Sequence, residues 1–243
     1  MSDICIFRRI EKKYLLTPTQ YNALRRRIDG YLEPDEYGRS TVMSLYLDTP
    51  DHRLIRSSIE AVDYKEKLRL RSYGTPRPDS RVFLELKKKF DGVVYKRRVS
   101  LTLRQADAYI RSGIKPFDSQ VFRELDYAMR FYGNPSPAAL ISYERLAYVV
   151  PSERALRITF DSDARYRVAD LRLTAGSAGK RLLPEGTVIL EIKTDGGMPL
   201  WLSRALDECG IRPGSFSKYG AAYRDLCRNE TRQERVMEDI RYA

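Results

Sequence analysis

The chain has 243 residues, of which 42% are hydrophobic, so it is long enough to bury a core and most simply forms one domain over residues 1–243. Its 44 lysines and arginines outnumber its 33 aspartates and glutamates, and the formal net charge of +11 predicts an anionic partner: a nucleic acid, an anionic membrane or a phosphate-rich small molecule. Three widely spaced cysteines suggest neither a disulfide framework nor a zinc site, and no apolar run is long enough to cross a membrane. We expect a soluble, cytoplasmic protein without an integral membrane segment, ending in a charged tail from about residue 228.

The N-terminal part of the chain predicts two strands and two helices. A strand over residues 4–16 would place Arg9, Glu11 and Lys13 on one face, because side chains two apart in a strand point the same way. The Thr-Pro-Thr-Gln sequence at 17–20 has the pattern of a capping box with proline at the first helical position. The expected elements are a strand at 4–16, a helix at 17–30, a strand at 41–48 and a short helix at 51–60.

The stretch from Tyr64 to Tyr73, YKEKLRLRSY, alternates charged and apolar residues with a period of two. In an extended strand its cations would project from one face, while Leu68 and Leu70 would project from the other. For a single strand, the simplest interpretation is a solvated outer face. The cationic row consists of Lys65, Lys67, Arg69 and Arg71.

Two further strands repeat this pattern and weaken the simple interpretation. They cover residues 82–90 and 93–100, and the Asp91-Gly92 pair between them is a strong hairpin signal. Like charges that face each other across a sheet are destabilising, so we expect a bound polyanion to neutralise these rows. The rows contain Glu85, Lys87, Lys89, Lys96 and Arg98.

The rest of the chain predicts an α+β fold. A strand at 187–194, TVILEIKT, again has Glu191 and Lys193 on one face. Many strands with short connections favour an antiparallel sheet, and a sheet with one charged and one apolar face can close into a barrel whose polar interior is filled with water and anions. Helices would cover the outside. The remaining expected elements are helices at 102–113, 118–132, 199–209 and from 216 onward, and strands at 140–150 and 156–166.

Several common chemistries are disfavoured. His52 is the only histidine, which argues against a Ser/His/Asp or Cys/His catalytic site. The Gly-rich stretch at 176–181 is not a phosphate-binding loop, because Thr174 stands where the first glycine is required and Arg181 where Ser or Thr must hold magnesium. Aromatic residues fall mostly on the face opposite the cations, as Tyr95 does, which disfavours base stacking and a nucleic-acid partner.

Eight short motifs occur along the chain. They are RIEKKY at 9–14, KLRLRSY at 67–73, FLELKKK at 83–89, YKRR at 95–98, SYER at 142–145, LRITFD at 156–161, LEIK at 190–193 and FSKY at 216–219. In this order they resemble the VTC domain, the catalytic domain of vacuolar-transporter-chaperone polyphosphate polymerases in the CYTH-like triphosphate tunnel metalloenzyme superfamily. The resemblance implies a closed antiparallel β-barrel of about eight strands with helices outside, whose basic lumen holds ATP, a growing polyphosphate chain and a divalent metal, Mn²⁺ or Mg²⁺.

The resemblance, together with the charged rows of the strands, suggests roles for individual residues. Glu191 matches the metal-binding glutamate, with Glu11 or Glu85 as a second candidate ligand. The expected catalytic residues are Arg69, Arg71, Lys87, Arg145 and Lys218. The expected ligands of the substrate phosphates are these five together with Lys13, Lys67, Lys89, Lys96, Arg98, Arg157 and Lys193.

Polyphosphate polymerisation from ATP is the leading hypothesis, with hydrolysis of triphosphate or short polyphosphate, and non-catalytic polyphosphate binding, as alternatives. Two departures from the family pattern bear on this choice. Arg9 replaces the first glutamate of the ExExK motif of the hydrolases, which fits the VTC branch. Ser215 stands where the polymerases have a basic residue, which puts polymerisation efficiency in doubt. The chain lacks the fused membrane and SPX-type regions of the eukaryotic proteins, so a membrane-protein partner stays open.

Overall fold

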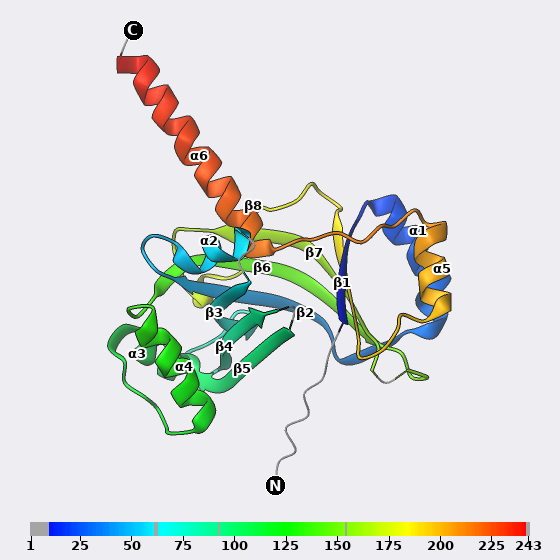
Figure 1. The fold of residues 1–243 in the computed structure, drawn as a ribbon, viewed down its shortest axis with the longest axis horizontal. Helices are drawn as coiled ribbons and strands as arrows, with labels where there is room; N and C mark the ends of the chain where they lie inside the picture. The colour runs from blue at the N-terminus through cyan, green and yellow to red at the C-terminus, as the bar shows by residue number, and fades with distance from the viewer. Residues whose placement is uncertain (1–9, 61–62, 92, 154, 242–243) are drawn as a thin grey trace.

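The fold is built on one antiparallel sheet, seen in a computed structural model that describes residues 10–60, 63–91, 93–153 and 155–241 (Figure 1). The expected strand residues 4–9, with Arg9, and Gly92 of the expected hairpin turn lie outside the described residues. The described strands follow the order β1-β9-β7-β6-β2-β3-β4-β5, and β8 pairs with β7. Their bounds are β1 Ile10–Leu16, β2 Glu33–Asp48, β3 Tyr64–Tyr73, β4 Arg81–Phe90, β5 Val93–Thr102, β6 Ser136–Val149, β7 Arg157–Arg167, β8 Lys180–Arg181 and β9 Val188–Thr194.

The sheet curls, but hydrogen bonds do not close it into the expected barrel. Among the described residues, β1 and β5 stand at the two ends of the strand order and share no ladder. The outer edge of β1 is instead engaged by the segment before the last helix, where the Gly214 N–H donates to the Lys13 carbonyl at 2.8 Å. A side-chain contact bridges the two halves of the curl, since Lys87 Nζ on β4 lies 3.8 Å from Glu11 Oε2 on β1.

Helices begin and end where local sequence signals place them. Both expected capping boxes are present, and Thr17 and Thr102 each accept a hydrogen bond from a backbone N–H three residues on. Gly113 ends its helix in the left-handed region, at φ 70°, which suits a residue without a Cβ. The helices are α1 Pro18–Ile28, α2 Arg53–Ile59, α3 Leu103–Ser112, α4 Gln120–Phe131, α5 Leu200–Glu208 and α6 Lys218–Arg241, with short 3₁₀ turns at Asp29–Tyr31 and Leu173–Ala175.

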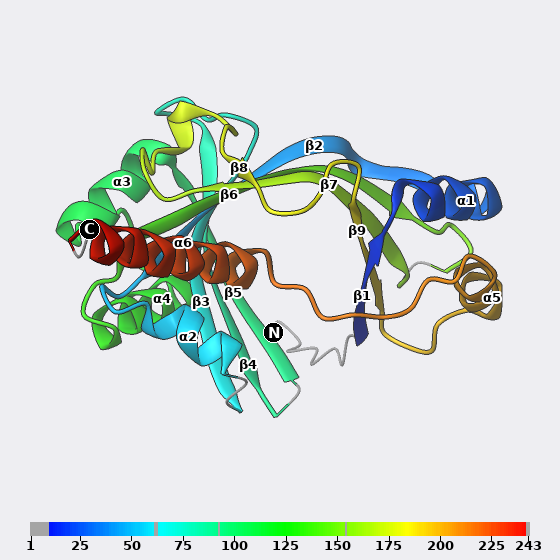
Figure 2. The same cartoon turned by 90° about the horizontal axis from the view of Figure 1, so that it is seen from above.

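The helices cover the outer face of the sheet in two groups. α3 and α4 lie together against one half, α1 and α5 lie together at the other half, and α6 projects away from the sheet (Figures 1 and 2). Under α3 and α4, Leu68 and Leu86 of the strands pack with Phe122 in one core. Under α1 and α5, Leu190 packs with Leu202 in another. Because the apolar residues of each strand point to these helices, the charged residues of opposite parity are left on the concave face.

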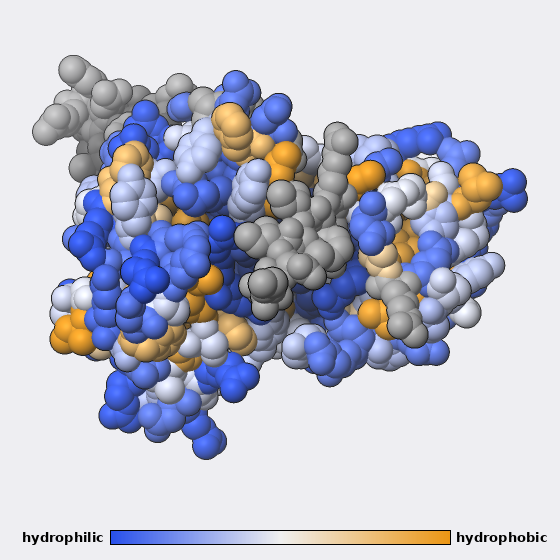
Figure 3. Space-filling model, turned by 60° about the horizontal axis from the view of Figure 1, so that its bottom comes forward, coloured by the Kyte–Doolittle hydropathy of each residue, from blue (hydrophilic) through white to orange (hydrophobic). Residues whose placement is uncertain are grey.

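A third apolar cluster sits on the concave side, at the start of α6. Tyr46, Ile141, Ile189 and Tyr219 are buried in it together with Ile55 of α2. This cluster closes part of the concave face and fixes the beginning of α6 against the sheet. The surface seen in Figure 3 is mostly hydrophilic, with hydrophobic residues in small separate groups.

Two parts of the sheet differ from the sequence-based expectation. β2 begins at Glu33, eight residues before the expected strand, and its first half is irregular, with a register shift against β6 between Pro34 and Arg39. The two-residue strand β8 was not predicted.

The last helix is longer than expected. α6 continues to Arg241, so the charged stretch expected as a tail is helical as far as that residue. Within the described residues, no helix has both the length and the apolar character required to span a bilayer.

Candidate functional site

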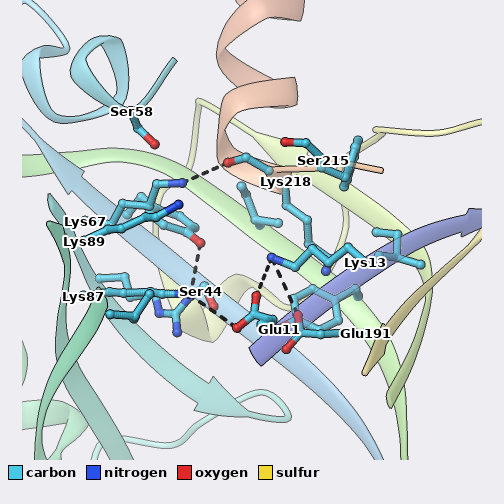
Figure 4. A pocket seen from close by; sticks show the side chains of 18 of the residues that line it. Glu11, Lys13, Ser44, Ser58, Lys67, Lys87, Lys89, Glu191, Ser215 and Lys218 are labelled. Atoms are coloured by element: carbon cyan, nitrogen blue, oxygen red, sulfur yellow. Dashed lines mark hydrogen bonds and ion pairs between the residues drawn. The ribbon is translucent and has the colours of Figure 1, made fainter. Parts of the chain in front are cut away.

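A cavity of about 520 Å³ occupies the concave face of the sheet, and side chains from β1, β3, β4, β9 and the start of α6 point into it (Figure 4). Ten of its described lining residues are cationic, whereas two are carboxylates, Glu11 and Glu191. The cavity therefore has the electrostatic character of a polyanion site. The cations are Lys13, Lys65, Lys67, Arg69, Arg71, Lys87, Lys89, Arg145, Lys193 and Lys218.

Strand register explains the concentration of positive charge. In the β3–β4 ladder, Lys65 lies opposite Lys89 and Lys67 lies opposite Lys87, so like charges face each other on two successive rungs. Lys67 donates to Ser217 Oγ at 3.0 Å. Burial, together with the ammonium groups of Lys87 and Lys13, lowers the pKa of Lys67 to about 8. Among the described residues, Lys65, Lys67 and Lys89 form no ion pair with a carboxylate.

Asp161 organises two of the expected catalytic residues, and the sequence analysis did not single it out. Its fully buried carboxylate accepts from Arg145 Nε at 2.6 Å and Nη2 at 2.8 Å, and from Lys218 Nζ at 2.6 Å. Burial alone would raise the pKa of Asp161, but the positive charges of Lys218 and Arg145 hold it below its ordinary value. A period-two reading of LRITFD, which puts Asp161 on the face of Arg157, could have found it.

Glu85 forms ion pairs with a second group of cationic side chains next to the cavity. Its carboxylate is 1% exposed and accepts from Arg69 Nε at 2.7 Å and Arg98 Nε at 2.6 Å, while Lys96 Nζ lies 2.8 Å away. Burial alone would raise the pKa of Glu85, but the positive charges of Arg69, Arg71 and Lys96 hold it well below its ordinary value. Glu85, Lys96 and Arg98 are not among the lining residues. Arg157 is also outside the lining, because its guanidinium pairs with Asp35 at 2.6 Å.

The two lining carboxylates form the part of the site that suits a divalent cation. Glu11 on β1 and Glu191 on β9 both approach Lys13 Nζ, at 2.8 and 3.8 Å, and Lys193 Nζ lies 2.5 Å from Glu191. The ladder pairs Glu11 with Lys193 and Lys13 with Glu191, which creates this checkerboard of charge. Burial would raise the pKa of Glu191, but Lys193, Lys13 and Arg145 hold it well below its ordinary value.

The donor set fits Mg²⁺ or Mn²⁺ when a phosphate ligand is also present. Mg²⁺ is usually held by one or two carboxylates together with substrate phosphates. Glu11 and Glu191 converge on the Lys13 ammonium, so their oxygens already surround a positive charge. In the described part of the chain, no cluster of three or more His, Cys, Asp or Glu residues could hold a metal without such help. Glu85 does not fit, because it lies outside the cavity lining and four cationic side chains already surround its carboxylate.

Two tyrosines form the floor between the arginines. The Tyr46 hydroxyl accepts from Arg69 Nη1 at 3.3 Å, and the Tyr143 hydroxyl accepts from Arg71 Nη2 at 3.4 Å. Lys218 Nζ lies 4.2 Å from the centre of the Tyr143 ring, a cation–π distance. Burial would raise the pKa of Tyr46, but the surrounding cations lower it to about 8. No pattern in the sequence indicates this use of tyrosine, because the alternation of charged residues does not extend into residues 41–48, which contain Tyr46.

Fold and site together define an α+β protein whose curled antiparallel sheet holds a cationic cavity with a pair of carboxylates at one side. The sequence matches the family model of the VTC domain over residues 8–227. The chain therefore belongs to the VTC domain family, which confirms the resemblance drawn from its motifs. No curated protein matches the chain in sequence.

Solved structures share the fold at low sequence identity. A candidate adenylate cyclase from Bacillus halodurans superposes with a TM-score of 0.52 and 15% identity, over 86% of this chain and 92% of that one. A candidate adenylyl cyclase from Hippeastrum, described as having a dominant triphosphatase activity, superposes with a TM-score of 0.54 and 16% identity, over 89% of this chain and 95% of that one. At these identities the likeness establishes the architecture alone.

Proposed function

We propose that this protein is a metal-dependent polyphosphate polymerase, which transfers the γ-phosphoryl group of ATP to the end of a polyphosphate chain and releases ADP. The observation that carries the proposal is the cavity of ten cations and two adjacent carboxylates in a VTC domain. Phosphoryl transfer depends mainly on aligning the reacting groups and neutralising their charge. The cavity supplies both requirements from rigid strands.

The arginines and lysines of the cavity would bind phosphates in different ways. Arg71 donates hydrogen bonds to the hydroxyl groups of Ser44 and Tyr143, and its Nε lies 4.0 Å from Glu85, so its guanidinium is less tightly paired than that of Arg69. Arg145 and Lys218 are fixed by Asp161 before a ligand arrives, which lowers the cost of ordering them. Arginine can grip phosphate oxygens at two points, whereas lysine acts as a point charge.

Glu191 and Glu11 would hold Mg²⁺ or Mn²⁺ beside the phosphates. Such an ion, when bound, neutralises charge on the transferring group and polarises it. The role of Lys13 follows from its position between the two carboxylates: it balances them in the ligand-free protein and can turn to a phosphate when they take a metal. Lys87 and Lys193 lie close enough to Glu11 to be released in the same way.

Hydrolysis of triphosphate by the same residues is the second candidate function. The triphosphatase activity described for the Hippeastrum protein, which shares the fold, favours it. The two functions differ in the acceptor, which is a terminal phosphate in one and water in the other. A polyphosphate-binding protein without catalysis is the third candidate, and in it Glu191 would have no essential role.

Product analysis separates these functions. The protein is incubated with ATP and Mn²⁺, and the products are resolved by chain length. Polymerase activity yields polyphosphate chains and ADP, hydrolase activity on ATP or tripolyphosphate yields short phosphates and no chains, and a binder yields neither while retaining tripolyphosphate in a binding assay. The second or third result would contradict the polymerase assignment.

A further inference from the structure

Thr159 on β7 carries a buried hydroxyl that has no hydrogen-bond partner among the described residues. The residue is 7% exposed. Its neighbours Ile158 and Phe160 point into the core under α1 and α5, so Thr159 points to the concave face, as Asp161 does. A buried hydroxyl without a partner lowers stability, and valine would fill the same space without that cost. Packing therefore does not account for the hydroxyl.

Strand register places this hydroxyl beside the carboxylate that suits a divalent cation. The β7–β9 ladder sets Thr159 opposite Glu191, and the β1–β9 ladder sets Glu191 opposite Lys13. On its other side, Thr159 faces Ala147 of β6, which has no polar side-chain atom. Side chains paired across two strands have Cβ atoms about 4.5–5.5 Å apart, so rotation about χ1 can bring the Thr159 hydroxyl to a Glu191 oxygen.

Ammonium groups lie at both oxygens of Glu191 in the ligand-free protein. Lys193 Nζ is 2.5 Å from Oε1, and Lys13 Nζ is 3.8 Å from Oε2 (Figure 4). A divalent cation held by the carboxylate would repel both ammonium groups. The carboxylate oxygen turned away from the cation would then need another donor, and the Thr159 hydroxyl lies on the adjoining strand, directly opposite.

We propose that Thr159 is a positioning residue for the metal site, whose hydroxyl donates a hydrogen bond to Glu191 when that carboxylate holds Mn²⁺ or Mg²⁺. The inference rests on the proposed function, because it takes Glu191 as a metal ligand. The hydrogen bond satisfies the buried hydroxyl and a carboxylate oxygen together, and it fixes the orientation of the carboxylate. Loss of such a contact to a metal ligand typically weakens metal binding by about 10–100-fold.

Two substitutions separate the hydroxyl from the shape of the side chain. Thr159→Val removes the hydroxyl and keeps the shape, whereas Thr159→Ser keeps the hydroxyl. The probe is imidotriphosphate, a tripolyphosphate analogue whose P–N–P linkages resist hydrolysis. Its dissociation constant is measured by titration calorimetry without metal and again in excess Mn²⁺. The ratio of the two constants reports the coupling between the metal and the phosphate ligand.

Thr159→Val should change this ratio toward the value of Glu191→Gln, by about tenfold or more, and leave the metal-free constant within about twofold of the wild type. Thr159→Ser should restore the ratio to within about threefold of the wild type. The melting temperature of ligand-free Thr159→Val should stay unchanged or rise by about 2–4 °C, because the hydroxyl has no hydrogen bond to lose.

Ser72→Ala is the matched control. The Ser72 hydroxyl is also buried without a partner among the described residues, but it lies on the outer face of β3 with Leu68 and Leu70. Its removal should leave the ratio of the two dissociation constants unchanged.

Each outcome decides the matter. If Thr159→Val keeps the wild-type ratio while Glu191→Gln loses it, the inference is overturned and the metal role of Glu191 stands. If Glu191→Gln also keeps the ratio, Glu191 does not hold the metal, and the proposed function loses its metal site together with the inference. A Thr159→Val protein that loses stability and metal-free affinity together would mark the hydroxyl as structural and would also overturn the inference. Thr159→Ala replaces the valine variant if that variant does not fold.

Discussion

The cations of the cavity differ in what neutralises them, and this difference governs the effect of each substitution. Arg145 and Lys218 share the buried Asp161. Lys13 balances Glu11 and Glu191 at the edge of the cavity. Removing a cation that holds a buried carboxylate leaves an unpaired charge, whereas removing a cation among like charges relieves repulsion.

Glu191→Gln tests the metal assignment. The substitution keeps the size of the side chain and removes the charge, so metal-dependent turnover should fall by roughly 10²-fold or more. Binding of tripolyphosphate without metal should persist or become tighter, because the cavity becomes more positive. Turnover and metal-free binding are measured side by side, with the exposed Glu208→Gln as the control. Full metal-dependent activity in Glu191→Gln would move the assignment to Glu11.

Lys67 should make anion binding sensitive to pH. Its pKa is lowered to about 8, so the side chain is charged below that pH and neutral above it. The affinity for tripolyphosphate should therefore fall several-fold as the pH rises from about 7 to about 9. Titration calorimetry across this range checks the expectation, and Lys67→Gln should flatten the profile. An unchanged profile in the variant would assign the effect to Tyr46, whose pKa is also about 8.

The stability of the ligand-free protein should rise with pH, whereas its affinity for tripolyphosphate should fall. The folded-state pKa of Lys67 lies below its ordinary value of 10.5, so the unfolded chain binds more protons between about pH 8 and that value. The free energy of unfolding contributed by Lys67 therefore rises with pH in this window. Tyr46 acts with the same sign, since its pKa is lowered from 10.0 to about 8.

At the scale of single elements, Arg71 of β3 should be dispensable for folding. Arg71 hydrogen-bonds to the neutral Ser44 and Tyr143, and its Nε is 4.0 Å from Glu85. Arg71→Ala should reduce turnover by roughly 10²–10³-fold while the melting temperature without ligand stays unchanged or rises slightly.

Arg145→Ala is the matched comparison, because it leaves the buried Asp161 with Lys218 alone. It should lower the free energy of unfolding by roughly 3–5 kcal/mol. Thermal and urea unfolding of the two variants separates the cases. A collapse of the melting temperature in Arg71→Ala would mark Arg71 as structural.

The start of α6 depends on a buried hydrogen bond. The Tyr219 hydroxyl donates to Asp48 Oδ2 at 2.9 Å, and the same carboxylate accepts from the backbone N–H groups of Leu54 and Ile55 at the start of α2. Tyr219→Phe should lower the free energy of unfolding by roughly 1–3 kcal/mol and reduce turnover by displacing the neighbouring Lys218. Urea unfolding measures the first effect. The exposed Tyr127→Phe is the control and should have no effect on either.

Sequence patterns predicted those strands and helices whose signals lie within their own residues. β3, β4 and β9 were predicted because alternation with period two is a local signal. The first half of β2 was missed because Pro34 and Gly38 break its pattern, and pairing with β6 imposes the strand there. The pairing of Lys96 and Arg98 with Glu85 could not be predicted, because it depends on the register between strands and on side-chain length, which parity does not encode.

At the scale of the whole molecule, the excess of positive charge should make stability depend on anions. Tripolyphosphate should raise the melting temperature, and a concentration of 100 times the dissociation constant would add about 2.7 kcal/mol to the free energy of unfolding. The gain should shrink as salt rises from about 0.1 M to about 1 M, since the screening length falls from about 10 Å to about 3 Å. Thermal scans at both salt levels test this, with adenosine as the uncharged control. A salt-independent gain would contradict an electrostatic site.

The ion pair between Lys87 on β4 and Glu11 on β1 joins two strands of the curled sheet that share no hydrogen-bonded ladder among the described residues. At 3.8 Å and partly exposed, such a pair is worth roughly 0–1 kcal/mol, far less than a ladder of backbone hydrogen bonds. Under the proposed function, a phosphate group that neutralises Lys87 would weaken its attraction to Glu11 and so the contact between β4 and β1. Anion binding in the cavity and loosening of this contact would then be thermodynamically coupled, so salt that screens the contact and a ligand that binds Lys87 should act on the same part of the sheet.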